Sequence, residues 1–329
     1  MSAQRLPWQD GQWQRIVAMQ TGGRMPHALL LRGPDGVGKT RFARHLLAAL
    51  LCERDGFDAS PCGACRGCKL VQADTHPDLQ ELVPLEGKQQ IGIDQVRELI
   101  GRIALTSQYG GRKAVVVAPA ERMTRAAANT LLKTLEEPPG DAVFVLVAHR
   151  AGALPATIRS RCQMVDFPVP GTEAARHWLA AELDSEEAAG SALRLAHGAP
   201  LNALGLATSG ALEAREAVLQ DLTRLTAGDG DPIATAQRWR DMGLVDALHW
   251  LQSMVCDLVR LKNGRMAHNL THSDRGPAMQ DLARGLDLSG LFRLFDLLLE
   301  ARRAALGQLN LNEQLLLESI AIEWQESGA

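Results

Sequence analysis

Short apolar runs separated by amphipathic stretches fill the first half of the chain. Three of the runs predict buried strands, at residues 27–32, 113–118 and 142–148, and residues 163–167 predict a fourth strand. Four stretches with apolar residues at helical spacing predict helices, at residues 41–51, 94–105, 122–137 and 155–160. Asp94 is the expected N-cap of the second helix. Strands that alternate with helices predict a parallel sheet covered on both faces.

The pattern changes after residue 170, where no convincing strand follows. Three short helices are expected at residues 173–183, 186–196 and 199–208, and longer ones from residue 211 onward. Two of these carry apolar stripes, formed by Leu244, Leu248, Leu251, Val255 and Leu258 and by Leu288, Leu291, Phe295, Leu298 and Ala301. The class is therefore α/β plus all-α, with an α/β domain at 1–169, a small helical domain at 170–209 and a helical domain at 210–329.

Composition and charge exclude several classes of protein. The chain has 329 residues, 46% hydrophobic and 22% charged, which is typical of a globular domain and not of a disordered chain. Its net charge of −3 gives no basic field, so contact with nucleic acid must be local or shared with partners. No stretch approaches the ~20 apolar residues of a membrane span, and the N-terminus lacks the apolar core of a signal peptide. A cytoplasmic location is expected.

A phosphate-binding loop is predicted at residues 33–40. The sequence GPDGVGKT matches the pattern GxxxxGK[ST] between a predicted strand and a predicted helix. Gly33, Gly36 and Gly38 let backbone N–H groups face phosphate oxygens at the start of the helix. Lys39 is expected to reach the β- and γ-phosphates, and Thr40 to ligate Mg²⁺. The alternative is a glycine-rich turn without a ligand, and the sequence leaves open whether ATP and Mg²⁺ bind.

The residues that hydrolysis would need are missing from the next strand. A hydrolytic site requires a carboxylate at the strand end to hold Mg²⁺ and to position water. Here the apolar run 113–118 leads into Ala118 and Pro119, and Glu121 lies too far along to be a good substitute. The loop thus looks complete while the hydrolytic residues look absent, unless another acid serves.

Four of the six cysteines form a cluster that predicts a structural zinc site. They are Cys52, Cys62, Cys65 and Cys68. Zn²⁺ takes four thiolates tetrahedrally, and each C-x2-C turn brings two sulfurs to one ion. Free thiols and a redox pair are the alternatives, and His76 is interpreted as an ordinary loop residue.

Two further segments carry a resemblance to a known family. The run NTLLKTLEEPP at residues 129–139, followed by Ser160, Arg161 and Cys162, resembles the bacterial clamp-loader group of AAA+ proteins. The cysteine cluster after the first helix is shared by that group. The resemblance covers residues 8–200 by motif, whereas the C-terminal helices match only in layout.

The resemblance implies a role for Arg161 and a set of partners. Arg161 corresponds to the arginine finger that reaches into the ATP site of a neighbouring subunit. Cys162 is interpreted as a small buried packing residue rather than a reactive thiol. Members that hydrolyse ATP carry Asp-Glu where Ala118 and Pro119 stand, and a polar sensor where Ala148 and His149 stand. The implied partners are gamma/tau and delta subunits in a hetero-pentameric ring, the sliding clamp and primer-template DNA, with no membrane. The C-terminal helices would then assemble the ring.

Three functional hypotheses follow. The first is a non-hydrolysing stator that donates Arg161 to an adjacent ATPase subunit. The second is an active clamp-loader ATPase of the gamma/tau type, which the missing acids disfavour. The third is a zinc-dependent nucleic-acid-binding module, which the acidic balance and the scarcity of aromatics disfavour.

Overall fold

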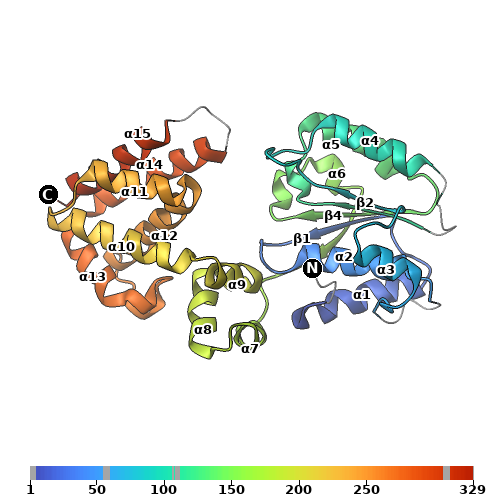
Figure 1. Cartoon of the computed structure of the whole chain (residues 1–329), viewed down its shortest axis with the longest axis horizontal. Coiled ribbons are helices and arrows are strands. Elements are labelled where there is room, and N and C mark those ends of the chain that lie inside the picture. The colour runs from blue at the N-terminus through green and yellow to red at the C-terminus, as the bar shows by residue number, and fades with distance from the viewer. Residues whose placement is uncertain (1–4, 55–59, 106, 108–111, 307–311, 329) are drawn as a thin grey trace. The chain divides into compact units, whose positions relative to one another are not determined.

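The chain folds into two compact units. The computed structural model describes residues 5–54, 60–105, 107, 112–306 and 312–328 (Figure 1). The first unit comprises Met1–Trp178 with Ala199–Asn202, and the second comprises Leu179–Gly198 with Ala203–Ala329. Within the described ranges, every helix is too short or too polar to span a lipid bilayer.

A five-stranded parallel sheet organises the first unit. Its strands, in the spatial order β2-β3-β4-β1-β5, are β1 (Ala28–Arg32), β2 (Leu79–Leu82), β3 (Lys113–Val117), β4 (Ala142–Ala148) and β5 (Gln163–Asp166). β1 pairs with β4 on one side and with β5 on the other. β1, the strand that leads into the glycine-rich loop, is therefore an internal strand of the sheet. Its carboxyl end lies beside the carboxyl end of β4.

Helices cover both faces of the sheet (Figure 1). One face carries α4 (Ile93–Ala104), α5 (Arg125–Glu136) and α6 (Ala156–Arg159). The other carries α1 (Asp10–Thr21), α2 (Lys39–Leu50) and α3 (Arg66–Gln72). Short 3-10 turns lie at Pro7–Gln9, Ala120–Arg122 and Ala151–Ala153. Because side chains alternate along a strand, Leu29 and Leu31 enter one core while Leu30 enters the other.

The structure confirms the four predicted strands and corrects several details around them. The edge strand β2, the helix α1 and the helix α3 were not predicted. Asp94 is not the N-cap of α4, so that prediction is wrong. The cap is Gly92, whose N–H donates to Gln95 Oε1 at 3.0 Å, and Asp94 lies within the first turn. The predicted helix at 122–137 begins later, at Arg125, because Thr124 accepts a capping bond from Ala127 N.

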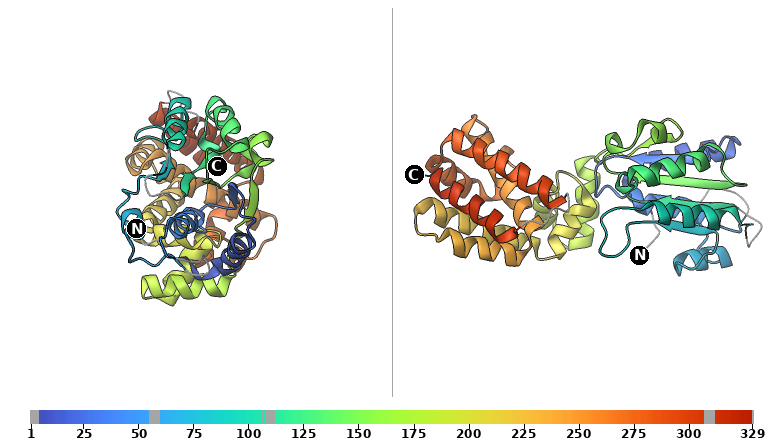
Figure 2. Two further views of the ribbon diagram at one scale, coloured as in Figure 1. Left: turned by 90° about the vertical axis from the view of Figure 1, so that its right-hand side faces the viewer. Right: turned by 90° about the horizontal axis from the view of Figure 1, so that it is seen from above.

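The described residues of the C-terminal half form helices joined by loops and contain no strand (Figure 2). Its helices are α7 (Thr172–Leu183), α8 (Glu186–Leu195), α9 (Pro200–Thr208), α10 (Ala211–Ala227), α11 (Pro232–Met242), α12 (Leu244–Lys262), α13 (Gly276–Gly285), α14 (Leu288–Leu306) and α15 (Glu313–Glu326). Two 3-10 turns, Ala267–Asn269 and Ser273–Arg275, lie in the predicted loop at 262–276.

One apolar core holds the second unit together. The predicted stripe on α12 is entirely buried, and in the stripe on α14 Leu291, Leu298 and Ala301 are buried while Leu288 is exposed. The sequence did not assign Trp239, Trp250 and Trp324 to core or interface, and all three lie in this core. The predicted α/β plus all-α class is thus confirmed, and the three-domain division at 169 and 209 stays a prediction.

Candidate functional site

The predicted phosphate loop connects the carboxyl end of β1 to α2. Residues 33–38 form the turn, and α2 begins at Lys39 after Gly38, whose φ of 89° is in the left-handed region. Thr40 follows in the first turn of the helix. The five predicted nucleotide-binding residues are therefore brought together at a helix N-terminus, where the helix dipole favours an anion.

Two other segments of the first unit hold this loop in shape. On one side Gln9 is buried, and its Nε2 donates to Val37 O at 3.2 Å and to Gly38 O at 3.0 Å. On the other side Leu201 N donates to Gly36 O at 2.9 Å. These bonds satisfy carbonyl groups of the loop and hold its backbone, while Gly36 N donates to Asp35 Oδ1 at 2.8 Å. No sequence pattern singled out Gln9 or Leu201.

The ammonium group of Lys39 is turned toward the loop itself. Its Nζ donates to Gly33 O at 2.7 Å and to Pro34 O at 2.5 Å, and lies 3.1 Å from His149 Nδ1. Burial lowers the pKa of Lys39 to about 8, although the carboxylates of Asp35 and Glu121 oppose that shift. The carbonyl acceptors of this desolvated ammonium are neutral, so a charged phosphate would be a stronger hydrogen-bond partner for it.

His149 completes a small polar cluster at the loop. Its Nδ1 lies 3.2 Å from Asp35 Oδ1 as well as 3.1 Å from Lys39 Nζ. Burial is the largest cause that lowers the pKa of His149, and the positive charge of Lys39 lowers it further while Asp35 raises it. The sequence identified position 149 only as lacking the usual sensor residue, so this contact across 110 positions of the chain was missed.

A cavity of about 960 Å³ opens beside the loop. Asp35, Lys39, Thr40 and His149 line one end of it, and it continues along α2 to the cysteine segment at Cys68. Its volume is within the range of small-molecule sites, which is roughly 300–1,000 Å³. A nucleotide whose phosphates occupied the loop would therefore find room in this cavity.

The end of β3 offers no carboxylate to this cavity. Ala118 and Pro119 follow the strand, as the sequence indicated. Glu121 does not line the cavity, because its Oε1 accepts the backbone N–H groups of His149 at 3.0 Å and Arg150 at 3.1 Å. Glu121 thus supports the turn after β4 while influencing Lys39 only through its charge.

The four clustered cysteines converge on one point. Their Sγ atoms all lie within 4.8 Å of one another. The Sγ atoms of Cys52 and Cys65 are 4.0 Å apart, and those of Cys62 and Cys68 are 3.8 Å apart. A tetrahedral zinc with Zn–S bonds of about 2.3 Å requires sulfur–sulfur edges of about 3.8 Å. The donor set and its spacing therefore fit a structural Zn²⁺ ion.

Backbone groups around the cluster favour thiolates. Cys65 N donates to Cys62 Sγ and Cys68 N donates to Cys65 Sγ, each at 3.3 Å. Such bonds lower the pKa of Cys62 to about 6, whereas burial raises the pKa of Cys68 to about 12. His76 is not part of the group, since its Nδ1 accepts from Asp78 N at 3.2 Å.

Arg161 lies just after α6, is partly exposed and is paired within its own chain. Its guanidinium forms an ion pair with Glu136, the first glutamate of the LEEPP segment. Nη1 also donates to Thr157 O at 3.0 Å. The neighbouring Cys162 is buried as expected, and burial raises its pKa to about 11. The two motifs that carried the resemblance are thus in contact, and no sequence pattern predicted this pair.

Two family models together match most of the chain. One described as DNA polymerase III, delta subunit, matches residues 8–170. The other, described as DNA polymerase III, delta subunit, C terminal, matches residues 209–326.

Curated relatives match over nearly the full length. DNA polymerase III subunit delta' of Pseudomonas aeruginosa is 39% identical, over 97% of this chain and 96% of that protein. The subunit delta' of Escherichia coli is 35% identical, over 96% of this chain and 94% of that protein. DNA polymerase III subunit tau of Escherichia coli is 32% identical, over 74% of this chain but only 37% of that protein.

Proposed function

We propose a stator function for this chain, which belongs to the family of DNA polymerase III delta' subunits. A stator is here a clamp-loader subunit that helps to open and load the sliding clamp without hydrolysing ATP itself. The observation that carries this proposal is the end of β3, where Ala118 and Pro119 replace the acids that hydrolysis needs. Glu121 supports the same conclusion, because its Oε1 accepts two backbone N–H groups and the residue does not line the cavity beside the loop.

Arg161 is the residue that we assign to catalysis, acting in trans as an arginine finger. A guanidinium beside the γ-phosphate of a neighbouring subunit stabilises the charge that develops during phosphoryl transfer. Its partial exposure and its place after a short helix support this role, because the side chain could exchange Glu136 and Thr157 O for the phosphate. The ATPase partner is a gamma/tau subunit, and the delta subunit completes a hetero-pentameric ring.

The remaining parts of the chain support this assembly. Zinc held by Cys52, Cys62, Cys65 and Cys68 would fix the segment between α2 and α3, and would supply no catalytic chemistry. The phosphate loop would bind ATP, with Mg²⁺ at Thr40, without turnover. Residues 170–209 form a lid domain and residues 210–329 a collar that packs in the ring, which meets the clamp and primer-template DNA in the bacterial cytoplasm.

The decisive experiment separates ATP binding from ATP hydrolysis. We expect the isolated chain to show no turnover, whereas an active ATPase of the gamma/tau type would show turnover that Lys39→Ala abolishes. In the reconstituted complex, Arg161→Ala is expected to slow hydrolysis at the site it serves by a factor of roughly 1,000 while the ring still assembles. Arg125→Ala, which removes another exposed arginine of the same domain, is the matched control. Unchanged turnover with Arg161→Ala would refute the finger assignment.

A further inference from the structure

One nitrogen atom of His149 faces two groups of opposite charge. Its Nδ1 lies 3.1 Å from Lys39 Nζ and 3.2 Å from Asp35 Oδ1. An ammonium can only donate hydrogen bonds and a carboxylate can only accept them. Nδ1 therefore accepts from Lys39 in the neutral ring whose proton is on Nε2, and donates to Asp35 when the ring is protonated on both nitrogens. A single proton decides which of the two partners His149 binds.

We propose that His149 is a proton-controlled latch on Lys39, which engages Lys39 when unprotonated and releases it to the terminal phosphate of a nucleoside triphosphate when protonated. The inference rests on the proposed binding of nucleotide to the phosphate loop. In the released state the imidazolium pairs with Asp35, which also offsets a negative charge that would repel the phosphate. The remaining bonds of Lys39, to Gly33 O and Pro34 O, are to neutral acceptors.

The charges around His149 set the direction of the effect. Asp35 from the loop and Glu121 from the turn after β3 favour its protonated form, whereas Lys39 from α2 and Arg122 disfavour it. An arriving phosphate draws the ammonium of Lys39 away from Nδ1 and adds negative charge nearby. Both changes favour protonation, so nucleotide binding takes up a proton at His149 and tightens as the pH falls.

The side chain is accessible to a ligand. His149 lines the same cavity as Lys39 and Thr40, and 23% of its side chain is exposed. Its backbone is fixed, since His149 N donates to Glu121 Oε1 at 3.0 Å. The ring can therefore respond to the phosphate while its attachment point stays in place.

Calorimetric titration of the full chain with AMP-PNP and Mg²⁺ tests the latch. Each titration is done between pH 6 and pH 7 in two buffers of different ionisation enthalpy, so that the number of protons taken up is measured directly. This window keeps Lys39 charged in every sample. His149→Gln removes the titrating ring. Asp35→Asn, at an exposed loop position, removes the negative charge that favours the imidazolium but keeps an Oδ1 acceptor for Gly36 N. His177→Gln, an exposed histidine of the same unit, is the control.

We expect the wild-type chain and His177→Gln to take up more protons than His149→Gln, by up to about one. Their dissociation constants should rise several-fold from pH 6 to pH 7, at most about tenfold, and those of His149→Gln and Asp35→Asn should rise less. The γ-phosphate titrates in the same range but contributes equally to all variants. Equal proton uptake with and without His149 would overturn the latch and leave nucleotide binding intact. No binding by the wild-type chain at any pH would overturn both, and would leave the role of Arg161 untouched.

Discussion

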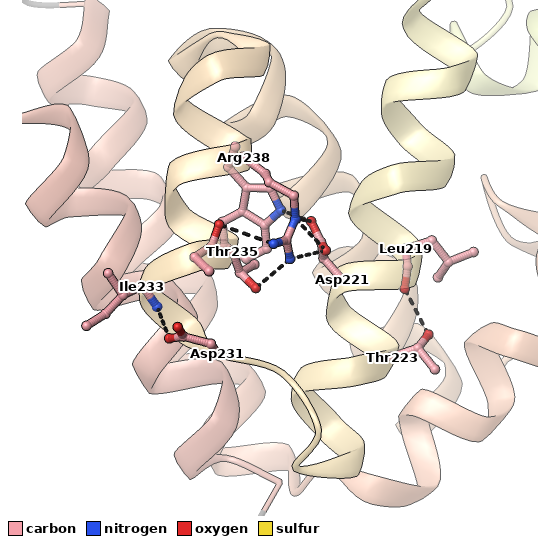
Figure 3. A network of polar contacts seen from close by, with 9 residues as sticks. Leu219, Asp221, Thr223, Asp231, Ile233, Thr235 and Arg238 are labelled. Carbon is pink, nitrogen blue, oxygen red and sulfur yellow. Dashed lines mark hydrogen bonds and ion pairs between the residues drawn. The ribbon is translucent and has the colours of Figure 1, made fainter.

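A buried carboxylate joins two helices of the second unit. Asp221, on α10, is 4% exposed. Its oxygens accept from Arg238 Nε at 3.1 Å, from Arg238 Nη2 at 2.5 Å and from the indole N–H of Trp239 at 3.1 Å, and both donors lie on α11 (Figure 3). Arg238 also donates to Thr235 Oγ1 at 2.9 Å. Removing the carboxylate thus breaks contacts between helices rather than within one.

The magnitude follows from the surroundings of each donor. Asp221→Ala leaves the indole N–H of Trp239, whose residue is fully buried, without an acceptor, at a cost of about 1–3 kcal/mol. Arg238 is 48% exposed, so water takes over part of its hydrogen bonding and this bidentate pair contributes about 1–2 kcal/mol. We therefore expect Asp221→Ala to lower the free energy of unfolding by about 2–5 kcal/mol, a large part of the stability of one domain.

Urea unfolding followed by circular dichroism and tryptophan fluorescence measures this loss. Trp239→Phe keeps most of the ring but removes its donor, so the double-mutant cycle of Asp221→Ala with Trp239→Phe isolates that one bond. Thr223→Ala is the control on the same helix, because Thr223 Oγ1 donates only to Leu219 O within α10 (Figure 3). A loss with Asp221→Ala no larger than that of Thr223→Ala would refute the reasoning.

Three further outcomes test other parts of the molecule. Cys65→Ser should reduce the zinc content of the purified chain from about one equivalent to near zero, measured by elemental analysis, with faster proteolysis near α3. Burial lowers the pKa of His272 to about 4, and the unfolded chain binds this proton at a pH near 6.5. The free energy of unfolding should therefore fall as the pH drops from about 6.5 to about 4, by up to about 1.4 kcal/mol per pH unit. Chemical unfolding at several pH values should show a weaker fall for His272→Asn, and an unchanged fall for the control His268→Gln. Gly33→Ala should cost more than about 2 kcal/mol of unfolding free energy, whereas Lys39→Met should change it by less than about 1 kcal/mol.

The elements that the sequence predicts best are those whose environment is uniform. β4 is buried along its whole length, so its seven residues form one apolar run and the predicted bounds are correct. β2 is an edge strand with the sequence LQEL, and only Leu82 is buried, so no apolar run indicates it. In α1 only Trp13 and Ile16 are buried, too few to produce a clear helical stripe.

In the candidate sites, the sequence predicts contacts between residues that are close along the chain and misses contacts between residues that are distant. The phosphate loop and the cysteine cluster each lie in one short stretch of chain, and spacing alone predicts which residues come together. The partners of Lys39 and Arg161 come from other elements, namely His149 after β4 and Glu136 at the end of α5. Sequence spacing has no bearing on such pairs, because the sheet order and helix packing bring them together.

The glycines of the phosphate loop and its lysine differ in what they reveal about a ligand. A Cβ atom on Gly33 would lie 1.9 Å from Phe167 O, and one on Gly36 would lie 2.3 Å from Cγ of Asn202 on a backbone with a φ of 75°. The fold alone therefore excludes a side chain at Gly33, where the clash is with backbone, and strains one at Gly36, whether or not a phosphate ever binds. The fold does not require a lysine at position 39, because burying an ammonium group is costly and a neutral side chain would fill the same space. Nucleotide binding is thus inferred from Lys39 and from the cavity beside it, and the glycine pattern by itself would be retained in a loop that binds nothing.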